Sequence, residues 1–171
     1  MNDLLLDTHI WIWYAEGIPG ALSPAITKQI DQARKQRCLY VSVVSAWEIG
    51  LLLAKSRIVL SAPLQEWVKA GAALPGLHMR TLTTEVAIES TVLPGDPHAD
   101  PADRFLIAEA RVSGLTLVTA DRKIIDYGLA GHVTVLAPSG TDKFKTFARF
   151  VIKQERQGTI PTVGKTHEQT T

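Results

Sequence analysis

The sequence contains one cysteine among its 171 residues, Cys38, and its longest apolar runs are a handful of residues. A lone cysteine forms neither an internal disulfide nor a thiolate zinc site, which excludes disulfide scaffolds and zinc fingers. A membrane-spanning helix needs about 20 apolar residues, so no such helix is expected. In a signal peptide, a basic region precedes the apolar stretch; here Asp3 and Asp7 bracket the first apolar stretch and no basic region precedes it. These absences predict a cytoplasmic protein in which Cys38 is a small core residue.

The composition is that of a globular protein, with 46% hydrophobic and 20% charged residues. The net charge of +1 is unevenly distributed: residues 1–138 hold 12 Lys and Arg against 14 Asp and Glu, whereas residues 139–171 hold 6 against 3. We therefore predict one domain over 1–138 and a basic C-terminal extension over 139–171. Apolar residues at helical spacing within the extension predict an amphipathic helix over about 142–155, followed by a mobile polar tail.

Short β-branched or leucine-rich segments alternate with stretches of helical apolar spacing along residues 1–138. This alternation predicts an α/β domain in which helices flank a central, mostly parallel sheet of four to five strands. The expected strands lie at residues 4–6, 38–44, 78–82, 115–118 and 132–136.

Four acidic residues stand where such a sheet collects ligands, beyond the carboxyl ends of its strands. Asp7 and Asp121 each follow a hydrophobic strand directly. Glu48 follows the second expected strand by about two helical turns if Ser42 caps the helix after that strand. Asp103 lies at the start of the helix that precedes the expected strand at 115–118, which leads to Asp121. Clustered carboxylates repel one another, so a divalent cation or raised pKa values must relieve the charge. Oxygen ligands favour Mg²⁺ or Mn²⁺, and hence phosphoryl transfer to water.

Each acid except one also has a structural interpretation. Asp103 is third in its helix, where a carboxylate stabilises the helix end. Glu48 completes a capping box if its helix begins at Ser45, and Asp121 could cap the helix that follows it. Asp7 has no evident structural role, and no single acid is a specific signal.

Taken together, the segments resemble PIN-domain ribonucleases, and more closely the VapC-like toxins of type II toxin-antitoxin systems. The resemblance covers residues 3–136, and it is the order, spacing and strand context of the motifs that make it specific. Its carriers are LLLDTH at 4–9, VSVVSAWEI at 41–49, PLQEW at 63–67, HADPADRFLIAEA at 98–110 and LTLVTAD at 115–121.

The resemblance implies a three-layer PIN-like fold, usually as a homodimer, and Mg²⁺- or Mn²⁺-dependent endonucleolytic cleavage of RNA that leaves a 5′-phosphate and a 3′-hydroxyl. It also implies an antitoxin protein as partner. The family's acidic quartet falls on the four acids above, and its polar residue before the last acid falls on Thr119, in a supporting role. The expected catalytic and metal-binding residues are therefore Asp7, Glu48, Asp103 and Asp121.

Their expected roles differ. Asp7, Asp103 and Asp121 are expected to ligate or orient the metal, whereas Glu48 ligates it or positions the attacking water. Arg104 and His9 are candidate contacts to RNA, although an exposed helix arginine and a packed histidine are the ordinary alternatives.

Two alternative functions remain open. A haloacid-dehalogenase-like phosphatase also begins with an aspartate after its first strand, but it has a second aspartate two residues later, where this chain has His9. A non-catalytic PIN-like protein could serve as a binding or scaffold module. The presence of all four acids disfavours that second alternative.

Overall fold

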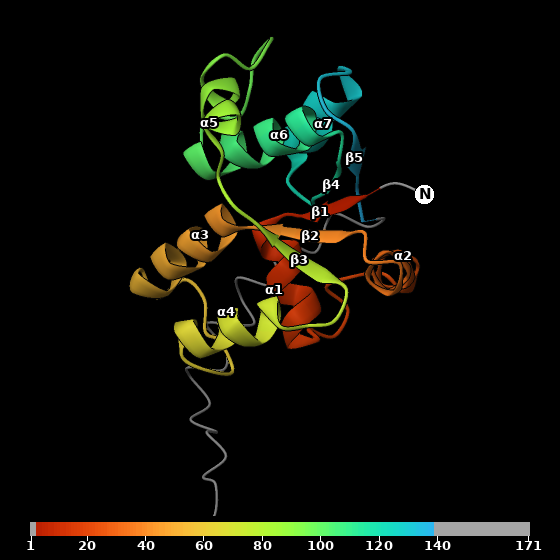
Figure 1. Ribbon diagram of the computed structural model, residues 1–171, viewed down its shortest axis with the longest axis vertical. Helices are drawn as coiled ribbons and strands as arrows, with labels where there is room; N and C mark the ends of the chain where they lie inside the picture. The colour runs from red at the N-terminus through yellow and green to blue at the C-terminus, as the bar shows by residue number, and fades with distance from the viewer. Residues whose placement is uncertain (1–2, 139–171) are drawn as a thin grey trace, which may run out of the picture.

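The computed structural model describes residues 3–138, in which five strands alternate with seven helices (Figure 1). The strands are β1 (Leu4–Leu6), β2 (Leu39–Ser42), β3 (Leu77–Arg80), β4 (Thr116–Val118) and β5 (Val135–Leu136). The helices are α1 (Thr8–Glu16), α2 (Pro24–Lys35), α3 (Val43–Ala54), α4 (Leu64–Ala72), α5 (Thr84–Thr91), α6 (Pro101–Ser113) and α7 (Arg122–Leu129).

All strand pairs of the sheet are parallel, in the order β3-β2-β1-β4-β5. The predicted parallel sheet of four to five strands is thus confirmed. The first strand of the chain is central, with Leu5 in register with Tyr40 on one side and Leu117 on the other. The strand order reverses at β1, and a crevice for ligands opens beyond the carboxyl ends of the strands at such a point.

Helices cover both faces of the sheet because successive side chains of a strand point to opposite sides. Leu4 and Leu6 belong to a core shared with α1, α2 and α4, whereas Leu5 belongs to a second core under α5, α6 and α7. Figure 1 shows the sheet between these two groups of helices. The three fully or nearly buried leucines of β1 therefore hold the three layers together.

Several local predictions need correction. The strand predicted over 38–44 ends at Ser42, because the Ser42 hydroxyl accepts a hydrogen bond from the backbone N–H of Val44 (3.2 Å) and so caps α3. Cys38 is half-buried, not a core residue. The predicted extension over 139–171, with its helix over 142–155 and its polar tail, lies entirely outside the described residues. Within residues 3–138, no helix is long and apolar enough to cross a membrane.

Candidate active site

The first two acids lie at the edge where the strand order reverses. Asp7 follows β1 and its backbone N–H donates to the carbonyl of Val118 (3.0 Å), the last residue of β4. Asp121 lies three residues beyond β4. The expectation that Asp7 has no structural role is wrong, since its carboxylate caps α1 by accepting the backbone N–H of His9 (3.3 Å).

Thr119 connects these two acids. Its hydroxyl donates to Asp7 Oδ2 and accepts the backbone N–H of Asp121 (3.0 Å). Both Asp7 and Thr119 are buried. The side chain of Asp121 caps α7 by accepting the N–H groups of Lys123 (2.8 Å) and Ile124 (3.1 Å) through Oδ1. The supporting position predicted for Thr119 therefore corresponds to a hydroxyl that holds Asp7 and the backbone of Asp121 together.

Glu48 comes to the same edge from α3. Because Ser42 caps this helix, the capping-box alternative with Ser45 is not the arrangement found. The Thr8 hydroxyl, fully buried at the start of α1, donates to Glu48 Oε2 (2.6 Å) and lies 3.0 Å from the Ser45 hydroxyl. Burial raises the pKa of Glu48 and the Asp7 charge raises it further, against the opposing effect of the Thr8 hydrogen bond.

Asp103 is the acid whose environment most opposes its charge. It lies in the first turn of α6, which Asp100 caps by accepting the N–H of Ala102 (2.9 Å). Burial raises the pKa of Asp103 from its ordinary value of 3.8 to about 8, and the next causes in order are the charges of Asp7, Glu48, Asp100 and Asp121. All three other predicted acids therefore lie near enough to Asp103 to oppose its ionisation. The helix-end interpretation of Asp103 also holds, so both of its expected roles are compatible with one position.

Sequence reasoning left His98 without a role, although its side chain lies between two of the acids. The imidazole Nδ1 is 2.9 Å from Asp103 Oδ2, and Nε2 is 3.7 Å from Asp121 Oδ1. The signal in the sequence was the resemblance of the segment 98–110 to a family motif, which carried no chemistry for the histidine itself.

The two candidate RNA contacts lie in different surroundings. The Arg104 guanidinium donates through Nε to the backbone carbonyl of Ser90 (2.8 Å) and so ties α6 to α5. His9 is partly exposed beside Asp7, tilted against the ring of Trp13, and its charge lowers the pKa of Glu48. His9 therefore lies at the acidic edge, whereas the bond through Nε gives Arg104 a packing role.

The donor chemistry of this edge fits a hard divalent cation. Four carboxylates converge there, and Mg²⁺ and Mn²⁺ prefer such oxygen ligands. Among residues 3–138, no lysine or arginine forms an ion pair with any of the four. Nor do any three His, Cys, Asp or Glu side chains of that range already stand in position to hold an ion. Mutual repulsion separates unneutralised carboxylates, so we expect a cation to draw them together.

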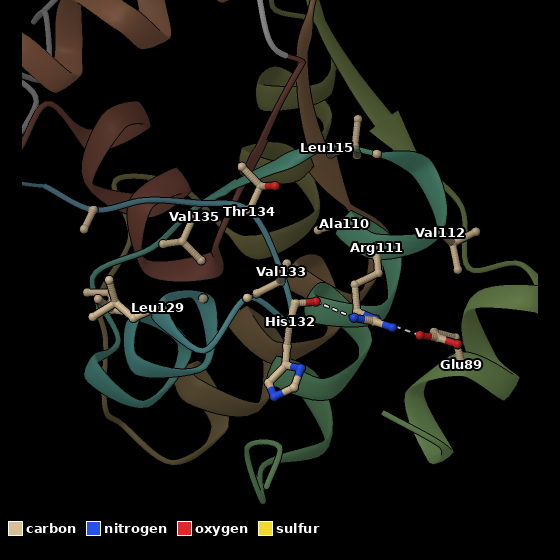
Figure 2. A pocket seen from close by; sticks show the side chains of 15 residues that line it. Glu89, Ala110, Arg111, Val112, Leu115, Leu129, His132, Val133, Thr134 and Val135 are labelled. Atoms are coloured by element: carbon tan, nitrogen blue, oxygen red, sulfur yellow. Dashed lines mark hydrogen bonds and ion pairs between the residues drawn. The ribbon is translucent and has the colours of Figure 1, made fainter. Parts of the chain in front are cut away.

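A separate cavity lies at the C-terminal ends of α6 and α7. This open cleft of about 840 Å³ is lined by residues that include Val112, Leu129 and Val135. In Figure 2 the Arg111 guanidinium crosses it, bonded to Glu89 and to the carbonyl of His132. Asp103 and Asp121 stand at the opposite, N-terminal ends of the same two helices, and none of the four acids lines the cavity, so it is separate from the acidic edge.

Comparisons with known proteins agree with this architecture. A family model described as PIN domain matches residues 4–129. Ribonuclease VapC22 of Mycobacterium tuberculosis (strain ATCC 25618 / H37Rv) is 34% identical over 137 residues, which is 79% of this chain and 99% of that protein.

Two solved structures share the fold at low sequence identity. The structure of VapBC2 from Rickettsia felis bound to a DNA fragment from their promoter matches with a TM-score of 0.59 and 14% identity, over 80% of this chain and 98% of the other. FitAcB from Neisseria gonorrhoeae matches with a TM-score of 0.53 and 18% identity, over 78% of this chain and 96% of the other.

Proposed function

The chain belongs to the PIN-domain family, and from that membership we propose that it is a VapC-like toxin, a metal-dependent endoribonuclease of a toxin-antitoxin pair. The relative named as a ribonuclease is matched over almost its whole length, which supports an activity on RNA. The family match removes the phosphatase alternative. The observation that carries the proposal is the grouping of the four acids at one edge of the sheet. Thr119 joins Asp7 to the backbone of Asp121, Thr8 next to Asp7 binds Glu48, and His98 lies between Asp103 and Asp121. No lysine or arginine of residues 3–138 forms an ion pair with any of the four acids.

We assign the metal to Asp7, Glu48, Asp103 and Asp121. When bound, Mg²⁺ or Mn²⁺ would supply an activated water and neutralise charge at the scissile phosphate. Hydrogen bonds from the protein hold three of the four acids: Thr119 holds Asp7, Thr8 holds Glu48, and the start of α7 holds Asp121.

The residues at the acidic edge have different proposed roles. Asp7, Asp103 and Asp121 ligate or orient the ion, and Glu48 ligates it or positions the water that attacks phosphorus while the 3′ oxygen leaves. His9, partly exposed beside Asp7, is proposed to contact RNA. Arg104 is the weaker candidate, because its Nε already binds the Ser90 carbonyl.

The proposed partners are an antitoxin protein and a second copy of this chain. The solved relatives include VapBC2 bound to promoter DNA, which supports an antitoxin protein as partner.

Val43, Trp47 and Leu51 recur every four residues on α3 and are exposed, Trp47 by 53%. Trp47 is therefore not part of the core. We propose that this face of α3 forms the contact between two copies of the chain. A monomer in sedimentation analysis of the full chain would contradict the proposed dimer. We propose that the protein acts in the cytoplasm, where its proposed RNA substrate is found.

Replacing Asp7 by asparagine tests the proposed nuclease. We expect Mg²⁺ to raise the melting temperature of the wild type, and Asp7→Asn to remove this effect and lower RNA cleavage by at least about a hundredfold, since even outer partners of metal ligands contribute 10–100-fold. Asp126→Asn is the matched control, because Asp126 is an exposed acid of α7 that pairs with Arg122. Expression of the wild type without an antitoxin should arrest bacterial growth, and Asp7→Asn should not. Normal cleavage by Asp7→Asn would refute the site, and the absence of cleavage by the wild type would favour a scaffold protein.

A further inference from the structure

His98 occupies the space between two acids that come from different elements. It precedes α6, and its side chain is only 13% exposed. The 2.9 Å contact of Nδ1 with Asp103 Oδ2 is within hydrogen-bonding distance, whereas the 3.7 Å between Nε2 and Asp121 Oδ1 is beyond it. Nδ1 can therefore donate to Asp103 when it carries the ring proton, whereas Nε2 is only near Asp121.

The segment that carries His98 is anchored at both ends. At its start, the Tyr127 hydroxyl of α7 donates to the carbonyl of Pro94 (2.6 Å). At its end, the backbone N–H of Asp100 lies 3.0 Å from the same Nδ1, which accepts this N–H when it carries no proton and donates to Asp103 when it carries one. These contacts place the imidazole over the first turn of α6.

The two neighbouring acids differ in how much they depend on this ring. Asp121 is oriented by two backbone N–H groups at the start of α7. For Asp103, by contrast, the His98 imidazole is the one hydrogen-bonding or ion-pair partner that residues 3–138 provide. A ligand carboxylate that lacks an orienting partner must be ordered when the metal binds, which weakens the affinity for the metal.

We propose that His98 is a positioning residue of the acidic site, whose imidazole donates to the Asp103 carboxylate and keeps it at the acidic edge, where it would join the other three acids around a divalent cation. The inference rests on the proposed function, because it assumes that the acids bind a cation. It assigns His98 no contact with the metal or with RNA.

Three substitutions separate this role from a general contribution to folding. His98→Ala removes both contacts. His98→Asn keeps the contact with Asp103, because its Nδ2 can donate to Asp103 from about the position of Nδ1, but it loses the contact with the Asp100 N–H, because its Oδ1 then lies elsewhere. His98→Gln retains a polar side chain of similar size but places its amide about one bond farther out. His78→Ala is the control, since His78 lies on β3 against Tyr40.

The measurement is calorimetric titration of the full chain with Mn²⁺, together with the melting temperature before and after the ion is added. We expect His98→Ala and His98→Gln to bind Mn²⁺ about 10–100-fold more weakly than the wild type. His98→Asn should recover most of the affinity, and His78→Ala should match the wild type. If His98→Ala does not fold, the Mn²⁺ affinities of His98→Gln and His98→Asn are compared instead, and weaker binding by His98→Gln supports the positioning role.

The possible results divide clearly. Equal or tighter binding by His98→Ala, or binding by His98→Asn as weak as that of His98→Gln, would overturn the positioning role and leave the proposed function intact. No binding of Mn²⁺ by the wild type would instead overturn the cation site itself, and with it both proposals.

Discussion

Two acids on α6, six residues apart, have opposite surroundings: Glu109 is buried and Asp103 is partly buried. Glu109 forms an ion pair with Arg80 of β3, whose Nε lies 2.8 Å from Glu109 Oε1 and whose guanidinium also bonds Ser113. Among residues 3–138, no lysine or arginine forms an ion pair with Asp103; its neighbours there are three further acids of the site, the helix cap Asp100 and the His98 ring. The same helix therefore carries one neutralised acid and one that is not.

The difference shows how to recognise a functional acid in this molecule. A buried carboxylate that is paired with an arginine links two elements of the fold, here α6 and β3. A group of carboxylates left without a basic partner costs stability in the absence of a ligand, so its presence points to a cation that binds there. Loss of the arginine that pairs with Glu109 should therefore lower the stability, whereas removal of the Asp103 charge should relieve a cost at neutral pH.

The largest effect on stability is expected where the paired acid loses its partner. Arg80→Met leaves Glu109 buried without a cation, and removal of one partner of a buried pair costs about 3 kcal/mol of unfolding free energy. Urea unfolding measures this loss. Arg122→Met is the control, because Arg122 forms an exposed pair with Asp126 (3.0 Å) that should contribute less than about 0.5 kcal/mol. Similar losses in the two variants would remove the distinction between the paired acid and an ordinary surface charge.

The pH dependence of stability tests Asp103, the acid that no lysine or arginine of residues 3–138 neutralises. In the folded protein the pKa of Asp103 is about 8, against an ordinary value of 3.8, so the unfolded chain releases this proton first. Between about pH 4 and pH 8 the unfolded state therefore binds fewer protons, and the contribution of Asp103 to stability falls as the pH rises. Urea unfolding with a chelator present, from pH 5 to pH 8, should show this decline in the wild type and a flatter profile in Asp103→Asn. An unchanged slope in Asp103→Asn would mean that another group causes the decline.

The smallest effect is expected from the hydroxyl that joins Asp7 to Asp121. Thr119→Val preserves the shape of this fully buried side chain but removes the donor to Asp7 Oδ2 and the acceptor for the Asp121 N–H. We expect about tenfold weaker Mn²⁺ binding, the lower end of the range for outer partners of metal ligands. Thr119→Ser retains the hydroxyl and should bind like the wild type. Equal affinities for Thr119→Val and Thr119→Ser would assign Thr119 to packing alone.

Much of the site could be predicted because its acids stand next to recognisable local signals. Asp7 and Asp121 follow strands that are evident from their apolar residues, and Asp103 follows the Asp100 cap. The contacts that orient these acids could not be predicted in the same way. The hydroxyl of Thr119 meets a carboxylate 112 residues earlier in the chain, and Arg104 reaches a carbonyl on another helix.

The sequence by itself determined the alternation of strands and helices and several helix ends, because these depend on neighbouring residues. Ser23 caps α2 and Pro24 is its first residue, and Gly114 ends α6 in the left-handed conformation (φ 64°) that glycine adopts without strain. Only the tertiary structure decided which charges are neutralised. Whether an acid meets an arginine, a histidine or another acid depends on which strands and helices pack together, and residues far apart in the chain supply those partners.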